Sequence, residues 1–229
     1  INAIVQAGHA AGATVGIDLA HSVGNVALTL HESNVDFATW CSYKYVNSSP
    51  GGISGIYVHE RHVNDQSLPK LIGWWGNRME TRFAMENSFD PYPTAESWAA
   101  SNVTALPMAA LRASLEIFDD AGGVVALRSK SQKQTAYLLY LLDELLGGDV
   151  QSLTPRDPEQ RGCQLSLEIV PDDIDGRAVF EAIEAAGVFC DWRFPNVIRV
   201  APTPLFNTFS EIRRFVDLLA GAIAANRTL

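Results

Sequence analysis

The feature of the sequence that most restricts the fold is a run of apolar, β-branched and aromatic residues from Val35 to Tyr45, which ends in Ser-Tyr-Lys-Tyr. Such a run is typical of a buried strand, and the Asn, Ser, Pro and Gly residues at 47–52 predict a turn after it. Lys44 therefore stands at a strand end. A lysine there either lies in solvent just past the strand or is desolvated, and desolvation makes its amine a usable nucleophile.

A second short apolar run, residues 14–18, ends in Asp18, and His21 follows three residues later. Ligands of an open parallel sheet bind beyond the carboxyl ends of its strands, so Asp18 and Lys44 would face one crevice. A pyridoxal phosphate enzyme needs this pair, because the lysine binds the cofactor aldehyde and the carboxylate keeps the pyridine nitrogen protonated. Taken singly, Asp18 is typical of a helix cap or turn, and His21 of a partly buried structural histidine.

Ordered blocks along nearly the whole chain closely resemble kynureninase, a fold-type I pyridoxal phosphate enzyme. The blocks are Asp18–Asn25, Val35–Phe37 with Trp40–Tyr45, Gly73–Gly76, Leu115–Phe118, Arg161–Leu165 and Ile198–Pro202. The resemblance implies an α/β fold. Residues 1–105 would be the C-terminal part of a large cofactor domain with a mostly parallel sheet, and 106–229 would be linking helices and a small α+β domain.

The resemblance also implies roles for single residues. Tyr43 would lie near the cofactor phosphate as a candidate proton donor, and Arg199 would bind the substrate α-carboxylate. Trp74 and Asn102 would reach the cofactor phosphate across the interface of a homodimer, with Ser101 near the substrate. The residues alone leave alternatives: Trp74 as core or interface filling, Asn102 as a helix cap, and Arg199 in a structural ion pair.

The activity implied is hydrolysis of the Cβ–Cγ bond of kynurenine or 3-hydroxykynurenine, which gives alanine and anthranilate or 3-hydroxyanthranilate in tryptophan catabolism and NAD biosynthesis. Family members usually carry His where this chain has Asn77, a departure that concerns recognition of the substrate ring. Kynureninases are much longer than this chain, so we interpret it as their C-terminal portion. Residues that stack on the cofactor ring would then lie in the N-terminal portion.

Two other interpretations remain open. Another fold-type I enzyme, of the cysteine desulfurase or aminotransferase kind, shares Asp, His and Lys in this order; but Cys41, Cys163 and Cys190 lie in no evident glycine-flanked loop, which disfavours a desulfurase. Alternatively, the chain is an inactive remnant or a dimerisation module.

Composition narrows the classes of function. The 229 residues carry a formal charge of −9, and their basic residues form no stripe, which argues against nucleic acid as a partner. The longest apolar runs fall short of the ~20 residues that span a bilayer.

Three cysteines without metal-ligand spacing favour a reducing cytoplasm. His59 and His62 lack a nearby third ligand, so we predict no metal site.

Periodicity and turn residues predict the elements. Helices are expected at 2–11, 107–118, 124–146 and 175–186, and from Thr208, where Glu211 completes a capping box. Strands are expected at 14–18, from 35 toward the lysine, and at 53–59, 162–169, 188–190 and 197–200.

Overall fold

The computed structural model describes residues 1–65 and 67–227, which form two compact units, Ile1–Asp120 and Ala121–Leu229. The sequence-based boundary at residue 105 precedes helix α3 (Ala105–Asp120), whereas the structure places this helix in the first unit. A buried contact joins this helix to the first unit: Ser114 of α3 donates a hydrogen bond from Oγ to the carbonyl oxygen of Val46.

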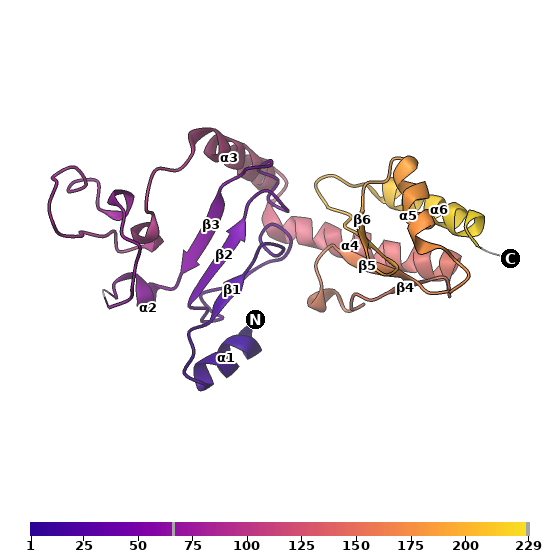
Figure 1. The fold of residues 1–229 in the computed structure, drawn as a ribbon, viewed down its shortest axis with the longest axis horizontal. Helices are drawn as coiled ribbons and strands as arrows, with labels where there is room; N and C mark the ends of the chain where they lie inside the picture. Colours follow the sequence, from indigo (N-terminus) through magenta and orange to yellow (C-terminus); the bar gives the residue numbers. More distant parts are fainter. Residues whose placement is uncertain (66, 228–229) are drawn as a thin grey trace. The chain divides into compact units, whose positions relative to one another are not determined.

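The first unit is built on a three-stranded sheet of β1 (Gly16–Asp18), β2 (Phe37–Cys41) and β3 (Ser54–Val58), which lie side by side in this order (Figure 1). β1 and β2 are parallel, but β2 and β3 are antiparallel. The expectation of a mostly parallel sheet is therefore wrong for these strands. The chain passes from β2 to β3 through residues 42–53 without a helix, whereas a parallel neighbour is usually reached through a crossover helix.

Helix α1 (Asn2–Ala10) covers one face of this sheet and buries Val5 against Val35 and Ala38. The opposite face is open, and Phe37 and Ile56 on it are each 45% exposed. The remaining elements of the unit are short: α2 (Glu60–Val63) and two 3-10 turns, η1 (Trp74–Gly76) and η2 (Ala95–Trp98).

The second unit packs three helices on one face of a four-stranded sheet. The helices are α4 (Gly123–Leu146), α5 (Gly176–Ala185) and α6 (Phe209–Ala225), and the strands are β4 (Val150–Ser152), β5 (Leu165–Ile169), β6 (Asp191–Arg193) and β7 (Val197–Val200). The 3-10 turn η3 (Pro158–Gln160) precedes β5. The strand order is β4-β5-β7-β6 and every pair is antiparallel, so this unit combines helices with an antiparallel sheet.

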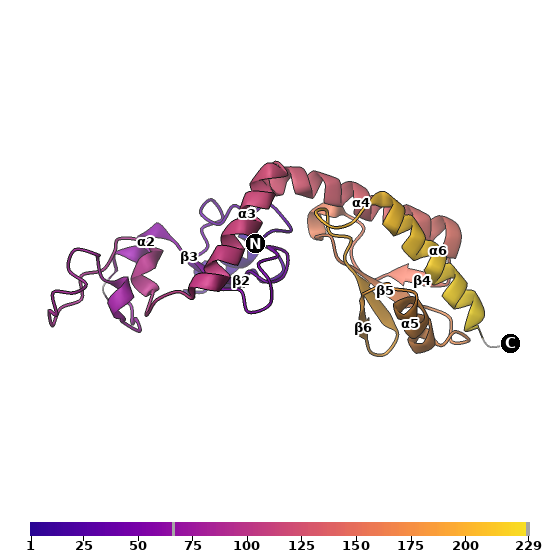
Figure 2. The same ribbon diagram turned by 90° about the horizontal axis from the view of Figure 1, so that it is seen from above.

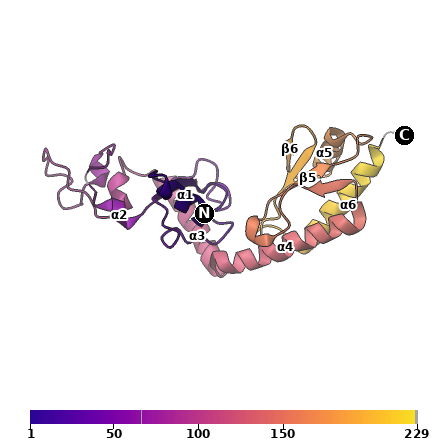
Figure 3. The same cartoon turned by 90° about the horizontal axis from the view of Figure 1, so that it is seen from below.

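The core of this unit lies between the sheet and the helices. Figures 2 and 3 show α4 and α6 side by side along the sheet. Residues that alternate along β5 and β7 point toward these helices, and Leu165, Leu167 and Ile198 are fully buried. The alternate residues of the same strands form an outer face that is mostly polar, with Ser166, Glu168 and Arg199 beside Val197.

The predicted helices are all present, and the capping box of Thr208 and Glu211 is formed. The strand expected at 188–190 is wrong. Gly187 follows α5 with a φ of 86°, and the apolar residues after it have no regular secondary structure, with Phe189 92% exposed. β6 begins only at Asp191. Within the described part of the chain, no helix is both long and apolar enough to cross a bilayer.

Candidate active site

The carboxyl ends of the parallel strands β1 and β2 meet at one edge of the first sheet, where Asp18 is the last residue of β1. Asp18 is exposed, and its Oδ1 accepts a hydrogen bond from the Ala20 amide at 2.8 Å. The chain beyond it continues along β2, because the Leu19 amide donates to the Thr39 carbonyl at 2.8 Å. Residues 18–20 therefore lie beside the end of β2.

Lys44 lies in a loop of residues 42–48 that follows β2, which we call the lysine loop. The buried hydroxyls of Ser42 and Ser48 share a hydrogen bond of 2.5 Å at its base, and the Ser48 amide donates to the Ser42 carbonyl at 3.0 Å. Inside the loop, the Asn47 amide donates to the Lys44 carbonyl at 3.0 Å. These bonds close the loop and present a half-buried Lys44 at the sheet edge.

The turn that carries His21 packs on the lysine loop. The His21 ring lies edge-on to the Tyr45 ring, with 6.0 Å between centroids. Gly24 has a φ of 81°, and a Cβ on it would lie 2.9 Å from the Tyr45 carbonyl carbon, so this position requires glycine. The half-exposed ring of Tyr43 has its centroid 5.7 Å from Lys44 Nζ. The structure thus brings Asp18, His21, Tyr43 and Lys44 to one edge.

Sequence reasoning missed the residues that hold this edge together. Ser42 and Ser48 close the lysine loop, Ser114 reaches it from α3, and Gly24 permits the close approach of the His21 turn. Ser114 gave a signal, because a polar residue occupies the apolar stripe of a predicted helix. The serines of the loop resemble ordinary turn residues and gave none.

Trp74, Ser101 and Asn102 form a second group in the first unit. The backbone of Gly73 packs directly against Ala100, which brings Trp74 next to the Ser101–Asn102 segment. All three side chains are exposed, and the Trp74 ring lies edge-on to Phe83 with 5.3 Å between centroids.

This second group does not converge on Lys44 within one chain. β3 runs antiparallel to β2, so α2 leaves the sheet at the end opposite the lysine loop, and the segment containing η1 lies beside α2 in Figures 1 and 2. Asn77, which replaces the His usual in the resembling family, has a structural role here. Its Oδ1 accepts a hydrogen bond from the Asp90 amide at 2.9 Å.

Arg199 belongs to the second unit and lies on the outer face of its sheet, since its neighbours Ile198 and Val200 are buried on the helical face. Its guanidinium forms an ion pair with Asp191 of β6, which also pairs with Arg193 at 2.7 Å. The ion pair that the sequence left open is therefore present, and the Arg199 side chain stays 29% exposed.

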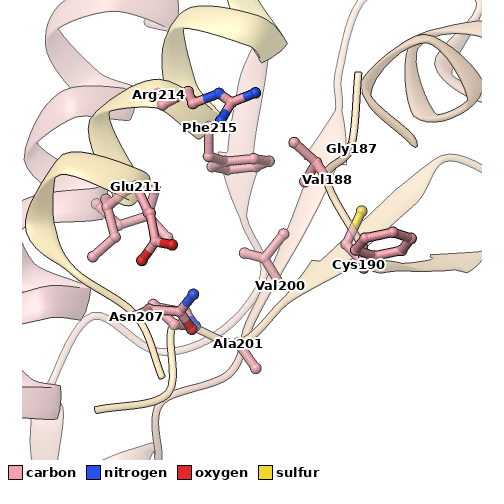
Figure 4. Close-up of a pocket in the computed structure, with 13 residues that line it drawn as sticks. Gly187, Val188, Cys190, Val200, Ala201, Asn207, Glu211, Arg214 and Phe215 are labelled. Atoms are coloured by element: carbon pink, nitrogen blue, oxygen red, sulfur yellow. The ribbon is translucent and has the colours of Figure 1, made fainter. Parts of the chain in front are cut away.

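A cavity of about 350 Å³ lies on the other, helical side of the same sheet (Figure 4). Val188, Val200 and Phe215 form apolar walls, and the polar groups of the lining include Asn207, Glu211 and Arg214. Burial, with smaller contributions from Glu184 and Asp191, raises the pKa of the Cys190 thiol in this lining to about 11. Cys190 is thus a protonated thiol near neutral pH and a poor nucleophile.

The first unit also contains a buried carboxylate, Asp36, at the start of β2. Its Oδ2 accepts from the Val15 amide at 2.7 Å and lies 2.8 Å from His9 Nε2, and its Oδ1 lies 2.7 Å from His62 Nε2 and pairs with Arg61. Burial by itself raises the pKa of Asp36, but these hydrogen bonds outweigh it and hold the pKa well below its usual range. Among the described residues, no group of three or more His, Cys, Asp or Glu side chains is suited to a metal ion.

The sequence of the chain is similar to a known protein family and to individual members of it. The family described as "Kynureninase C-terminal domain" matches residues 127–219. The kynureninase of Xanthomonas oryzae pv. oryzae (strain PXO99A) is 50% identical over 222 residues, which cover 97% of this chain and 52% of that protein. The chain therefore spans about half the length of the curated relatives it matches.

Solved structures show the same fold at low identity. The cysteine desulfurase CsdA of Escherichia coli has a TM-score of 0.74 at 17% identity, over 98% of this chain and 55% of its own. A mutant of C-DES with glycine covalently linked to the PLP cofactor has a TM-score of 0.68 at 18% identity, over 87% of this chain and 49% of its own. The chain thus has a fold like that of fold-type I pyridoxal phosphate enzymes.

Proposed function

Because the chain is a homologue of the kynureninases over the C-terminal half of their length, we propose that it supplies that half of a centre that hydrolyses L-kynurenine or 3-hydroxy-L-kynurenine. The products are L-alanine and anthranilate or 3-hydroxyanthranilate. The observation that carries the proposal is the shared sheet edge, where Asp18 and the lysine loop end two adjacent parallel strands.

The residues at this edge fit pyridoxal phosphate. A half-buried amine is held on a closed loop, and an exposed carboxylate lies at the neighbouring strand end with one of its oxygens bound to the Ala20 amide. Lys44 would hold the cofactor covalently, and Asp18 would bind the ring nitrogen, with His21 and Tyr43 beside them. The bound cofactor supplies an acceptor for electrons from the substrate α-carbon.

The chain's own side chains would then act on the substrate. Arg199 binds the α-carboxylate with its planar fork, and Ser101 lies near the substrate. The Lys44 amine moves the proton at the α-carbon. Water adds at the γ-carbonyl, the Cβ–Cγ bond breaks, and Tyr43 donates a proton to the carbonyl oxygen or to Cβ.

A second copy of the chain completes the proposed site. Trp74 and Asn102 lie away from the Lys44 of their own chain, so they would reach the cofactor phosphate of a partner. Exposed apolar side chains of the surrounding segment support an interface between copies. They are Leu71, Ile72, Trp74, Met79, Phe83 and Met85.

The first experiment tests the covalent site. The chain is incubated with pyridoxal phosphate, reduced with borohydride and dialysed, and mass spectrometry locates the added group. We expect the added group on Lys44. The yellow absorbance measured before reduction should be absent from Lys44→Ala because the amine is gone. Fixation at other lysines to the same extent, or in Lys44→Ala, would contradict the assignment.

The second experiment tests the activity through the fluorescence of anthranilate. L-kynurenine is added to the chain alone and to the chain mixed with the N-terminal half of the Xanthomonas relative, a mixture we call the reconstituted assembly. Anthranilate formation in the assembly supports the proposal. A chain that loads cofactor but forms no anthranilate in either sample would instead be an inactive remnant.

The fold neighbours make a cysteine desulfurase the second candidate. Two of the three cysteines argue against it, because Cys163 is fully buried and the Cys190 thiol has a raised pKa, whereas Cys41 is partly buried at the end of β2. Release of sulfide from L-cysteine under the same conditions would favour this candidate over the first.

A further inference from the structure

We infer that Asp191 is a positioning residue for Arg199: its carboxylate fixes the direction of the Arg199 guanidinium, which leaves the rest of the fork for the substrate α-carboxylate. The inference rests on the proposed function for the identity of that carboxylate. It concerns the outer face of the second sheet, on the opposite side from the cavity of Figure 4.

The register of the sheet puts the two residues together. Asp191 in β6 lies directly opposite Arg199 in β7, and side chains of such a pair share a face and are within reach of each other. Arg199 donates from a terminal nitrogen to Asp191 Oδ2. Among the residues that the structure describes, Asp191 is the acidic side chain that lies within ion-pair distance of Arg199.

Arg193 keeps this group attractive to anions. Its terminal nitrogen lies 2.7 Å from the same Asp191 oxygen, so one carboxylate serves two guanidinium groups. We call Arg193, Asp191 and Arg199 the outer-face triad. An isolated Arg–Asp pair would be neutral, whereas the triad carries a net charge of +1 and still draws in a carboxylate.

Asp191 has two opposite effects on substrate binding, one through the orientation of Arg199 and one through its own charge. A bidentate bond to a carboxylate requires the planar guanidinium to be held in one direction, and Asp191 provides the hold. Its negative charge, however, opposes the approach of another carboxylate. Replacing Asp191 by Asn therefore weakens substrate binding if orientation dominates, and strengthens it if charge dominates.

The kinetic test uses Asp191→Asn in the reconstituted assembly. We expect the KM for L-kynurenine to rise about tenfold, equivalent to about 1.4 kcal/mol, with kcat changed by less than about twofold. Asp191→Glu should recover part of the loss because it keeps the carboxylate. The matched control is Asp217→Asn, which removes the same charge from an exposed ion pair with Arg213 on α6 and should leave KM unchanged.

A second readout does not depend on turnover. Nitrogen-15 NMR of the full chain reports how fast each guanidinium rotates. Rotation of Arg199 should be restricted in the unaltered chain and in Asp217→Asn, and fast in Asp191→Asn. Titration with L-kynurenine should shift the Arg199 signals at lower concentration in the unaltered chain than in Asp191→Asn.

The outcomes separate the inference from the proposed function. Absence of anthranilate from an unaltered assembly that has loaded pyridoxal phosphate contradicts the proposed function, and the Arg199 signals then still decide the inference. A lower KM in Asp191→Asn, free rotation of Arg199 in the unaltered chain, or Arg199 signals that do not respond to L-kynurenine would each overturn the positioning role.

Discussion

At the scale of single residues, Asp36 is the clearest source of stability that depends on pH. Its hydrogen bonds tie α1 and α2 to the start of β2, and its pKa is held below the usual value in the folded chain. In the unfolded chain the carboxyl titrates near its ordinary value of about 4. The contribution is therefore complete above about pH 4 and is lost as the pH falls toward the folded pKa.

We expect Asp36→Asn to lower the free energy of unfolding at pH 7 by about 2–3 kcal/mol, because hydrogen bonds to a charged group are lost. The variant should also flatten the acid limb of the stability curve, measured by denaturant titration between pH 2 and 7. Asp217→Asn, whose carboxylate is exposed, should leave the curve nearly unchanged. An equal loss of free energy of unfolding in both variants would show that the hydrogen bonds of Asp36 stabilise the fold no more than an exposed ion pair does.

At the scale of elements, the approach of the His21 turn to the lysine loop depends on Gly24. We expect Gly24→Ala to cost more than the ~1–2 kcal/mol of a left-handed alanine, because its Cβ would also meet the Tyr45 backbone. Less pyridoxal phosphate should then be fixed by borohydride. Thermal unfolding and cofactor retention measure the two effects.

Gly12→Ala provides the matched control for this prediction. Gly12 has a φ of 76°, close to the 81° of Gly24, but a Cβ on it would meet no atom within 4 Å. It should therefore show the backbone cost without the loss of cofactor. Similar behaviour of the two variants would mean that the contact with Tyr45 is unimportant.

Elements could be predicted from the sequence where periodicity was strong. The long apolar stripe of α4 and the capping box of α6 gave helices at the expected places. β4 has three residues and no apolar alternation, so it gave no signal, and the apolar but irregular segment 188–190 gave a false one. The direction of β3 could not be predicted from the sequence either, because its antiparallel orientation depends on which strand it pairs with.

Of the candidate site, only the residues with reactive or charged side chains could be predicted from the sequence. Asp18 and Lys44 stand out because charged residues seldom end apolar runs. Ser42 and Ser48 do not, because a hydroxyl that closes a loop looks like any turn residue until its partner is known. The pairing of Arg199 with Asp191 likewise needed the register of β6 and β7.

At the scale of the whole molecule, the exposed apolar segment from Leu71 to Met85 predicts self-association. We expect the chain to be a dimer by light scattering after gel filtration, because a lone copy leaves these side chains in water. A double variant, Phe83→Asp with Met85→Asp, should shift it to a monomer. The matched control is Phe189→Asp, a 92% exposed residue of the second unit, which should leave the mass unchanged.

The reversal of chain direction between β2 and β3 also bears on how such sequences can diverge. Everything from α2 to η2 departs from the end of the sheet remote from Lys44. Insertions and deletions in that stretch would therefore alter how two copies meet while sparing the local geometry of the amine. Sequence changes in that stretch could therefore alter how two copies pair, and any specificity that the pairing confers, without changing the sheet edge that carries Asp18 and Lys44.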